Sequence, residues 1–323
     1  MPDLLPPTVA MPPRRAGDVR VGHLLSDEPR HTTRVAILGF PSDAGVKRNA
    51  GRPGAALAPA LIRHHLYRLT PPGNAPGSEP DRFTELLRST IDLGDVACTG
   101  DVAADQHTLG QAIAELLAYD QRITPIVLGG GHETSFGHFL GYANTQQNIS
   151  IVNLDAHADV RPLEPPDNQP HSGSPFRQAI EYASQHTSGG CSRYTAAGLN
   201  PHTTAPEHVA WIKDHEGQAY FRSELTAELM AKLYTQQPDD VLATFDLDAV
   251  DQSQAPGVSA PNACGLDKRL WLYAAYAAGR SPSVRSMDLV ELSPPHDRDD
   301  QTARLAALTV WEFLTGLSQR ANP

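Results

Sequence analysis

The 323-residue sequence has few cysteines, no long apolar segment and no excess of positive charge. Cys98, Cys191 and Cys264 are far apart and form no CxxC pair, which favours a reducing cytoplasm over a disulfide framework. No segment approaches the roughly 18 apolar residues that a membrane helix requires. The formal net charge of -11 argues against a nucleic-acid partner, because phosphate binding needs a positive surface. We therefore expect a cytoplasmic globular protein whose function lies in a localised site.

The sequence predicts a simple domain organisation. Residues 1–33 are broken repeatedly by proline and contain no apolar core of signal-peptide length, so we expect a flexible N-terminal leader. No repeat or linker interrupts the rest of the chain, which predicts one catalytic domain over residues 34–323. The turn-rich segment at 71–81 is typical of a surface loop.

Short β-branched runs alternate with amphipathic segments, a pattern that predicts a parallel sheet covered by helices. The strands are expected at 34–40, 124–130, 149–155, 241–248 and 284–292, with weaker signals at 91–96, 194–200 and 219–223. The helices are expected at about 54–69, 105–120, 133–143, 175–186, 206–215, 224–236, 266–278 and 300–318.

Unusual polar residues follow or end the strongest strands, in the motifs "GGGHE", "DAHAD", "DLDAVD" and "ELSPPHD". The carboxyl ends of parallel strands meet at one edge of a sheet, where ligands bind. These four distant segments are therefore expected to share one site.

The motifs contain the side chains of a metal centre. In "DAHAD" the ligand types recur at every second residue, which in extended chain places them on one side, and "DLD" repeats the spacing. Four aspartates at one sheet edge would repel each other unless cations neutralise them, and two divalent ions match their charge. Mixed carboxylate and imidazole ligands suit Mn²⁺, with Zn²⁺, Co²⁺, Ni²⁺ or Fe²⁺ as alternatives. The candidate ligands are His132, Asp155, His157, Asp159, Asp246 and Asp248.

Together "GGGHE", "DAHAD" and "DLDAVD" resemble the motifs of the ureohydrolase (arginase/agmatinase) superfamily, over roughly residues 34–318. The resemblance implies a three-layer α/β/α arginase-like fold with a mostly parallel sheet of about eight strands. It also implies that the six candidate ligands bind two Mn²⁺ per subunit, and that the chain forms a homo-oligomer. In this superfamily a hydroxide that bridges the metals attacks a guanidinium or amidine carbon.

Further residues match functional positions of the superfamily. His171 in "QPHSGSPF" resembles its proton-shuttling histidine, and Asp159 is a second candidate for proton transfer. Glu291 in "DLVELSP" resembles the carboxylate that pairs with the cationic end of the substrate. The sequence departs from the arginase motif "GGDHS" at Gly131, where a glycine replaces the aspartate, and Glu133 is a candidate to compensate.

Arginines near the metal motifs suggest a substrate with carboxylates, because guanidinium binds carboxylate in a bidentate manner. Arg161 and Arg177 rank first as the carboxylate ligands. The basic cluster Arg48, Asn49 and Arg52 ranks second, because anchoring of the following helix N-terminus is an equally open role for it. "SDAGVKRNAGRPGA", "HSGSPFRQ" and "APGVSAP" most resemble the formimidoylglutamase branch of the superfamily. That resemblance implies hydrolysis of the dicarboxylate N-formimidoyl-L-glutamate to L-glutamate and formamide.

Three other interpretations remain open at this point. One is an agmatinase, arginase or guanidino-acid hydrolase, which would release urea from a site with the same metals. Another is a single-zinc deacetylase of related fold, which needs only one aspartate, histidine and aspartate set. The last is a catalytically silent metal-binding or regulatory protein, against which the presence of His171 and Glu291 argues.

Overall fold

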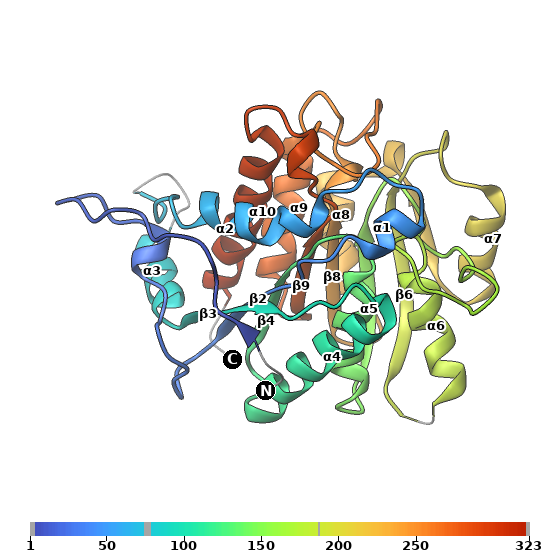
Figure 1. Ribbon diagram of the computed structural model, residues 1–323, viewed down its shortest axis with the longest axis horizontal. Coiled ribbons are helices and arrows are strands. Elements are labelled where there is room, and N and C mark those ends of the chain that lie inside the picture. Colours follow the sequence, from blue (N-terminus) through green and yellow to red (C-terminus); the bar gives the residue numbers. More distant parts are fainter. Residues whose placement is uncertain (1–3, 74–78, 187, 321–323) are drawn as a thin grey trace.

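The computed structural model describes residues 4–73, 79–186 and 188–320. At its centre lies a nine-stranded sheet (Figure 1). Its strands are β1 Leu4–Leu5, β2 Val35–Gly39, β3 Thr90–Val96, β4 Thr124–Leu128, β5 Asn148–Leu154, β6 Gly190–Leu199, β7 Gln218–Phe221, β8 Val241–Asp246 and β9 Val284–Val290. They are arranged in the order β1-β3-β2-β4-β9-β8-β5-β6-β7.

The sheet is parallel except at one edge, where the two-residue β1 pairs antiparallel with β3. Every residue of β2, β4 and β8 is buried. Strands that are buried on both faces read as continuous apolar runs, which is why these segments were easy to recognise in the sequence. The eight parallel strands correspond to the eight strands that the sequence predicts.

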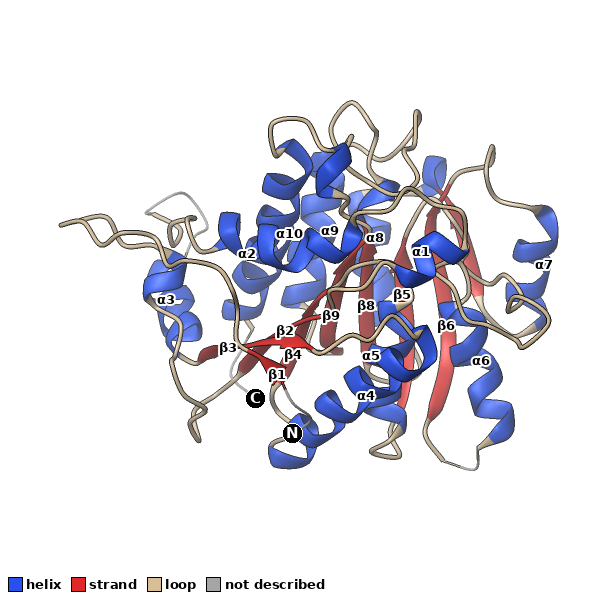
Figure 2. Cartoon of the chain, in the orientation of Figure 1, coloured by secondary structure: helices blue, strands red, loops and turns tan. Residues whose placement is uncertain are grey.

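Helices cover both faces of the sheet (Figure 2). Five of them share one apolar core, to which Ile62, Phe83, Trp271 and Phe313 contribute: α2 Ala58–Leu66, α3 Pro80–Arg88, α8 Ala227–Thr235, α9 Lys268–Arg280 and α10 Gln301–Ser318. On the opposite face lie α4 Val102–Tyr119, α5 Thr134–Ala143, α6 Pro175–Gln185 and α7 Pro206–Asp214. The short α1 Ala44–Arg48 follows β2. In the described residues, every helix is too short or too polar to cross a membrane.

The strand order brings the predicted motifs together. Strands β4, β9, β8 and β5 are consecutive neighbours at the centre of the sheet, although they lie far apart in the sequence. All four run in the same direction, so their carboxyl ends open on the same edge. Crossover helices make this possible, because parallel neighbours cannot be joined by tight turns.

The N-terminal segment, for which we predict a flexible leader, makes defined contacts with the domain from residue 4 onward. Leu4 and Leu5 pair with β3, and Val21 is fully buried. The backbone N–H of Val21 donates to the carbonyl of Leu69 at 2.8 Å. The frequent prolines in this segment prevent regular structure, but a chain without regular structure can still pack on a sheet edge.

The predicted helices and strands are all present, with shifts of a few residues at their ends. The sequence reading missed β1, α1 and α3. The two helices are short and begin beside glycine or proline signals that are typical of loops, and α3 starts within the predicted 71–81 loop. Residues 74–78 of that loop lie outside the described residues.

Candidate metal centre and active site

Each predicted ligand lies at or just beyond the carboxyl end of a central strand. His132 follows β4, and the "DAHAD" residues follow β5. Asp246 is the last residue of β8, and Asp248 lies in the 3₁₀ turn Leu247–Ala249. The sheet therefore gathers the motifs at one edge as the sequence predicts.

The first ligand group has His132 at its centre. Its Nδ1 lies 3.3 Å from Oδ2 of Asp155, 2.9 Å from Oδ2 of Asp159 and 3.0 Å from Oδ2 of Asp246. The four ligand atoms all lie within 4.8 Å of one another. Three carboxylate oxygens and one imidazole nitrogen at these separations form a set of donors that suits a divalent transition metal.

The second ligand group adjoins the first through Asp155. Nδ1 of His157 lies 3.1 Å from Oδ2 of Asp248 and 3.5 Å from Oδ1 of Asp155. Asp155 thus directs one oxygen towards each group, as a carboxylate that bridges two cations does.

Two buried atoms in the ligand groups are available to bind cations. His132 Nδ1 and Asp248 Oδ1 have no partner with hydrogen-bond geometry among the described residues. Buried polar atoms are nearly always satisfied by protein, water or a ligand, so exceptions that converge with other donor atoms indicate a ligand. The residues present therefore fit a pair of metal ions.

The electrostatics of the two groups favour added positive charge. Burial and the neighbouring Asp248 raise the pKa of Asp246 well above its ordinary value. Burial also raises the pKa of Asp248 to about 6. The charge of Asp248 raises the pKa of His157. Burial opposes a charged His132, but the three carboxylates that face its Nδ1 raise the pKa of His132 above its ordinary value. Divalent cations would relieve this crowding because they neutralise several carboxylates at once.

The spacing of the ligands has a different origin from the predicted extended chain. Oδ1 of Asp155 accepts the backbone N–H of His157 at 2.7 Å, and Oδ1 of Asp246 accepts that of Asp248 at 2.8 Å. These bonds form Asx turns, in which a side chain two residues back holds the backbone. Asp159 has a φ of +45°, which also departs from extended geometry. Turns after the strands, rather than strand alternation, direct the ligands to one side.

A buried chain of hydrogen bonds supports His132 from behind. Its Nε2 lies 3.0 Å from Oγ1 of Thr244, which lies 3.2 Å from Oγ of Ser135. Ser135 donates to Oδ1 of Asp288 at 3.1 Å, and Nδ1 of His138 lies 2.9 Å from the other oxygen of Asp288. A carboxylate at the end of the chain favours the tautomer with the proton on Nε2 of His132, which leaves Nδ1 free to bind metal.

Glu133 fills the space that Gly131 leaves open. A Cβ atom added at position 131 would lie only 2.1 Å from Oε2 of Glu133. The other oxygen, Oε1, accepts the backbone N–H of Gly45 at 2.8 Å, at the start of α1. Burial raises the pKa of Glu133 to about 7. The glycine and the glutamate are thus a matched pair, and the glutamate connects the metal centre to α1.

Glu291 points into the site from the end of β9. It has a φ of +68°, a left-handed conformation that is uncommon for residues other than glycine and turns the chain sharply after the strand. Its Oε1 accepts the backbone N–H of His132 at 2.6 Å. Burial, with Glu133 nearby, raises the pKa of Glu291 to about 8.

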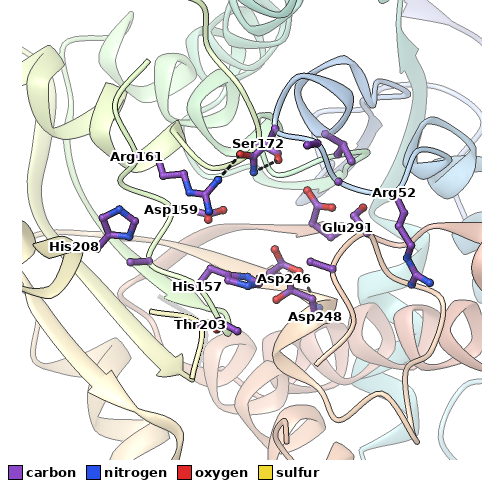
Figure 3. A pocket seen from close by; sticks show the side chains of 17 residues that line it. Arg52, His157, Asp159, Arg161, Ser172, Thr203, His208, Asp246, Asp248 and Glu291 are labelled. Atoms are coloured by element: carbon purple, nitrogen blue, oxygen red, sulfur yellow. Dashed lines mark hydrogen bonds and ion pairs between the residues drawn. The ribbon is translucent and has the colours of Figure 1, made fainter. Parts of the chain in front are cut away.

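A cavity of about 250 Å³ opens above the ligand groups (Figure 3). Its acidic residues are all at the metal end: Asp159, Asp246, Asp248 and Glu291. The remaining wall is formed by neutral and basic residues: Val46, Asn49, Ala50, Gly51, Arg52, His157, Ala158, Arg161, Ser172, Thr203, His208, Ser259 and Ala260. We call the part made by Asn49, Arg161, Ser172, Thr203 and His208 the outer wall.

Of the predicted substrate residues, Asn49, Arg52 and Arg161 line the cavity. Nη1 of Arg161 donates to Oδ1 of Asn49 at 2.8 Å, and Nδ2 of Asn49 donates to Oγ of Ser172 at 3.1 Å. Arg52 donates to the carbonyls of Pro256 and Val258, and its head points away from Arg161 in Figure 3.

The other two predicted arginines lie outside the cavity lining. Arg177 donates to the carbonyl of Val160 at 2.9 Å, pairs with Glu181 and stacks on the ring of Trp211 with its guanidinium carbon 4.3 Å from the ring centre. Arg48 donates to the carbonyl of Pro170. Both side chains connect segments of the protein, which a sequence pattern cannot distinguish from ligand binding.

His171, the predicted proton shuttle, is fully buried and does not line the cavity. Its Nε2 lies 3.0 Å from the carbonyl of Pro162, and its Nδ1 accepts the backbone N–H of Gly173 at 3.1 Å. Both ring nitrogens therefore support the turn that presents Ser172 to the cavity.

The sequence reading missed the remaining members of the outer wall: Ser172, Thr203 and His208. Ser172 follows His171 directly, so its place could have been inferred once that loop was assigned to the site. His208 lies in the first turn of α7, in a segment without any recognisable motif. Only the packing of α7 against β7, at the edge of the sheet, brings it to the cavity.

Comparisons with known proteins agree with this picture. A family model described as "Arginase family" matches residues 33–316. Formimidoylglutamase of Chromobacterium violaceum is 34% identical over 290 residues, which cover 86% of each chain. Formimidoylglutamase of Rhodococcus jostii is 35% identical over 300 residues, covering 86% of this chain and 84% of the relative.

Solved structures show the same architecture. Trypanosoma cruzi formiminoglutamase with Mn²⁺₂ aligns with a TM-score of 0.85 and 27% identity, covering 94% of this chain and 100% of that one. Formimidoylglutamase of Bacillus subtilis aligns with a TM-score of 0.81 and 25% identity, covering 96% and 97%. The predicted three-layer fold is confirmed, and the metal named for the first of these structures is the one that the ligand set favours.

Proposed function

The chain belongs to the arginase family, and we propose that it hydrolyses N-formimidoyl-L-glutamate to L-glutamate and formamide, a step of histidine degradation. As a member of this family it is a hydrolase that acts on a guanidino or amidine C–N bond. The choice of substrate within the family is the part that we propose.

The separation of charge along the cavity is the observation that carries the proposal. All four acidic lining residues lie at the metal end, whereas the outer wall has one arginine, one histidine and no carboxylate. An amidine with two carboxylates on the same molecule complements this arrangement. Its amidine faces the metal end, and its carboxylates extend to the basic wall.

The same separation disfavours guanidino substrates that carry an amine. The ammonium group of agmatine would lie beside Arg161 and meet no acidic partner on the outer wall. Two cations so close together repel each other, which disfavours an ammonium group at this wall. Arginine would bring a carboxylate but also an ammonium group, so it is a poorer match than a substrate whose distal groups are all anionic.

We assign the two predicted metal sites to Mn²⁺, held by His132, Asp155, Asp159 and Asp246 in one group and by Asp155, His157 and Asp248 in the other. When bound, such a pair supplies a water molecule of lowered pKa and neutralises the clustered carboxylates. His132 is oriented for this role by its Nε2 contact with Thr244.

The residues of the chain provide proton transfer and orientation. Asp159 lines the cavity and is the first choice for accepting the proton released by the attacking water and returning it to the leaving nitrogen. Glu291 accepts a hydrogen bond from the amidine through Oε2, since its Oε1 is taken by His132 N–H. His171 remains a second candidate for proton transfer, and its ring would first have to leave its contacts with Pro162 and Gly173.

The reaction balances without any further reactant. The water oxygen bonds to the formimidoyl carbon, and the bond between that carbon and the α-nitrogen of glutamate breaks. One proton of the water goes to that nitrogen, which leaves as the amine of L-glutamate. The carbon and its remaining nitrogen leave as formamide.

Product analysis after incubation with Mn²⁺ tests the proposal. N-formimidoyl-L-glutamate, agmatine, L-arginine and 4-guanidinobutyrate are assayed in parallel for formamide, glutamate and urea. Equal amounts of formamide and glutamate from the first substrate, without urea from the others, are expected. Urea from a guanidino substrate, with no formamide, would retain the metal centre and refute the proposed substrate.

A second measurement addresses the metal itself. Titration of the chelator-treated protein with Mn²⁺ is expected to restore activity at two ions per chain. Full activity at one ion per chain would instead favour a single-metal hydrolase and contradict the role of Asp155 as a bridge.

A further inference from the structure

The outer wall contains two basic side chains, Arg161 and His208, each with hydrogen-bond donors that the described part of the protein leaves unused. The Arg161 side chain makes one hydrogen bond, from Nη1 to Asn49, and among the described residues its Nε and Nη2 have no hydrogen-bond partner. His208 is half-buried, and in the described part of the chain neither of its ring nitrogens is hydrogen bonded. Figure 3 shows the ring of His208 beside the Arg161 side chain at the rim of the cavity.

The surroundings of Arg161 are built to hold it in place. Asn49, at the end of α1, connects Arg161 to Ser172. Gly173 leaves the necessary space, because a Cβ atom there would lie 3.0 Å from Nδ2 of Asn49 and 3.2 Å from Cδ of Arg161. The guanidinium is therefore oriented before any ligand binds, which reduces the entropic cost of binding.

Arg177 fixes the position of His208 relative to Arg161. It donates to the carbonyl of Val160, the neighbour of Arg161, and stacks on Trp211, which lies one helical turn beyond His208 in α7. One half-buried side chain thus connects the two segments that carry the free donors. This contact explains the conformation of Arg177 without a direct role in substrate binding.

From this arrangement we propose that His208 and Arg161 together bind one carboxylate of the substrate, and that His208 is a residue that determines specificity. The inference rests on the proposed function, because it assigns a partner to one of the two carboxylates of N-formimidoyl-L-glutamate.

The chemistry of the pair explains the selectivity. Arg161 supplies the positive charge and the unused N–H donors of Nε and Nη2, and an imidazole N–H adds a donor from a second direction. Burial and the charge of Arg161 lower the pKa of His208, so the ring is mainly a neutral donor near pH 7. A neutral second donor binds a carboxylate without adding the repulsion that two adjacent cations would create.

The test combines variants of the protein with substrates that lack one carboxylate. N-formimidoyl-4-aminobutyrate lacks the α-carboxylate, and N-formimidoyl-L-2-aminobutyrate lacks the side-chain carboxylate. For the parent substrate, His208→Ala is expected to raise KM about tenfold, the effect of one hydrogen bond to a charged group, and to leave kcat within about twofold. His208→Asn keeps an N–H donor and is expected to recover part of the loss.

The decisive result is a change of KM that depends on the substrate. For the analogue that lacks the carboxylate bound by His208 and Arg161, His208→Ala is expected to change KM less than about twofold. For the other analogue, the rise should remain about tenfold. Because L-glutamate is the product, its Kd should increase in the same variant when binding is measured by calorimetry with Mn²⁺ present.

His202→Ala is the matched control, since His202 is an exposed histidine in the connection just before α7 and does not line the cavity. Its KM values should equal those of the unaltered protein. An equal rise of KM for all three substrates in His208→Ala would overturn the inference and indicate a general change of structure. If the unaltered protein releases no formamide from any of them, the proposed function itself fails, which is a distinguishable result.

Discussion

The metal end and the outer wall of the cavity are built in different ways. The metal end is made by residues at the ends of central strands, and His132, Asp155, Asp246 and Asp248 are all buried. The outer wall is made by the loops after β5 and β6, the end of α1 and the first turn of α7. Its members are half-buried or exposed except for Ser172. Strand ends in a rigid sheet fix metal geometry, whereas loops allow the substrate to be changed while the chemistry stays the same.

Electrostatics divides the two regions as well. At the metal end, buried carboxylates crowd together and shift each other's pKa values. The outer wall offers donors that its own side chains leave partly unused. We therefore expect changes at the metal end to affect every substrate equally and changes on the outer wall to affect mainly KM.

The largest effect is expected for Asp155→Asn, because Asp155 faces both ligand groups. The loss of its charge should lower kcat by more than about a thousandfold, since activation of water by metal lowers its pKa by many units. Metal analysis should find fewer than two Mn²⁺ per chain. The matched control is Asp240→Asn, an exposed aspartate at the opposite end of β8 with a side chain 53% exposed, which should behave as the unaltered protein. Retention of both metals and of activity would contradict the assignment.

A smaller effect is expected for Asp288→Asn, behind His132. The chain of hydrogen bonds from Asp288 through Ser135 and Thr244 fixes the tautomer of His132. Its disruption should weaken Mn²⁺ binding by about 10- to 100-fold, as found for outer partners of metal ligands. Competition with a fluorescent chelator measures this affinity directly. Ser286→Ala is the control, because Ser286 lies on the same strand but outside this chain of hydrogen bonds. An equal loss of Mn²⁺ affinity in that variant would contradict the explanation.

For His171→Asn we expect a change in KM and little change in the chemistry of the metal end. Its ring holds the turn that presents Ser172, so its loss should raise KM about five- to tenfold, the effect of one or two hydrogen bonds. The pH dependence of kcat should keep its shape. If kcat instead falls by more than about a hundredfold and one limb of the pH profile disappears, His171 is the proton carrier and belongs to the chemistry of the metal end.

The smallest effect concerns pH and the stability of the metal-free protein. In the folded state the pKa is raised to about 7 for Glu133 and about 8 for Glu291, from 4.5. A raised carboxyl pKa contributes stability that is complete below 4.5 and is lost as pH rises through the folded value. The pKa values of His132 and His157 are also raised above the ordinary value of 6.5, so these groups likewise lose their contribution to stability as pH rises above 6.5.

The chelator-treated protein should therefore unfold at a lower temperature at about pH 8 than at about pH 5, by about 1–2 °C for each kcal/mol lost. With Mn²⁺ the trend should reverse, because ionised ligands bind cations more tightly as pH rises. Thermal unfolding followed by circular dichroism measures both series. A melting temperature of the metal-free protein that is constant or rises over this range would contradict the cited pKa shifts.

Much of the metal end was predictable from the sequence because its signals are local. The motif "DAHAD" contains three of the ligands within five residues, and "DLD" contains two more. The predicted reason for their convergence was incomplete, since Asx turns and the left-handed Asp159 replace the expected extended chain. The sequence thus predicted the types of the ligand residues but not the backbone geometry that positions them.

The outer wall was only partly predictable because its members come from segments without motifs. Arg161 was found beside a ligand, but Arg177 and Arg48 have the same sequence character and turn to other contacts. His208 gave no signal at all. An arginine can bind a ligand, a carbonyl or an aromatic ring, and the sequence does not indicate which of these partners lies nearby.

The sequence by itself determined the class of fold, the ligand types and the family. These depend on the period of apolar residues and on short motifs, which act over a few residues of chain. Only the tertiary structure decided that α7 carries His208 to the rim, that Arg177 connects the two basic segments and that Glu133 fills the space above Gly131. These contacts join residues that are far apart in the chain, and they form only where the layers of the fold pack together.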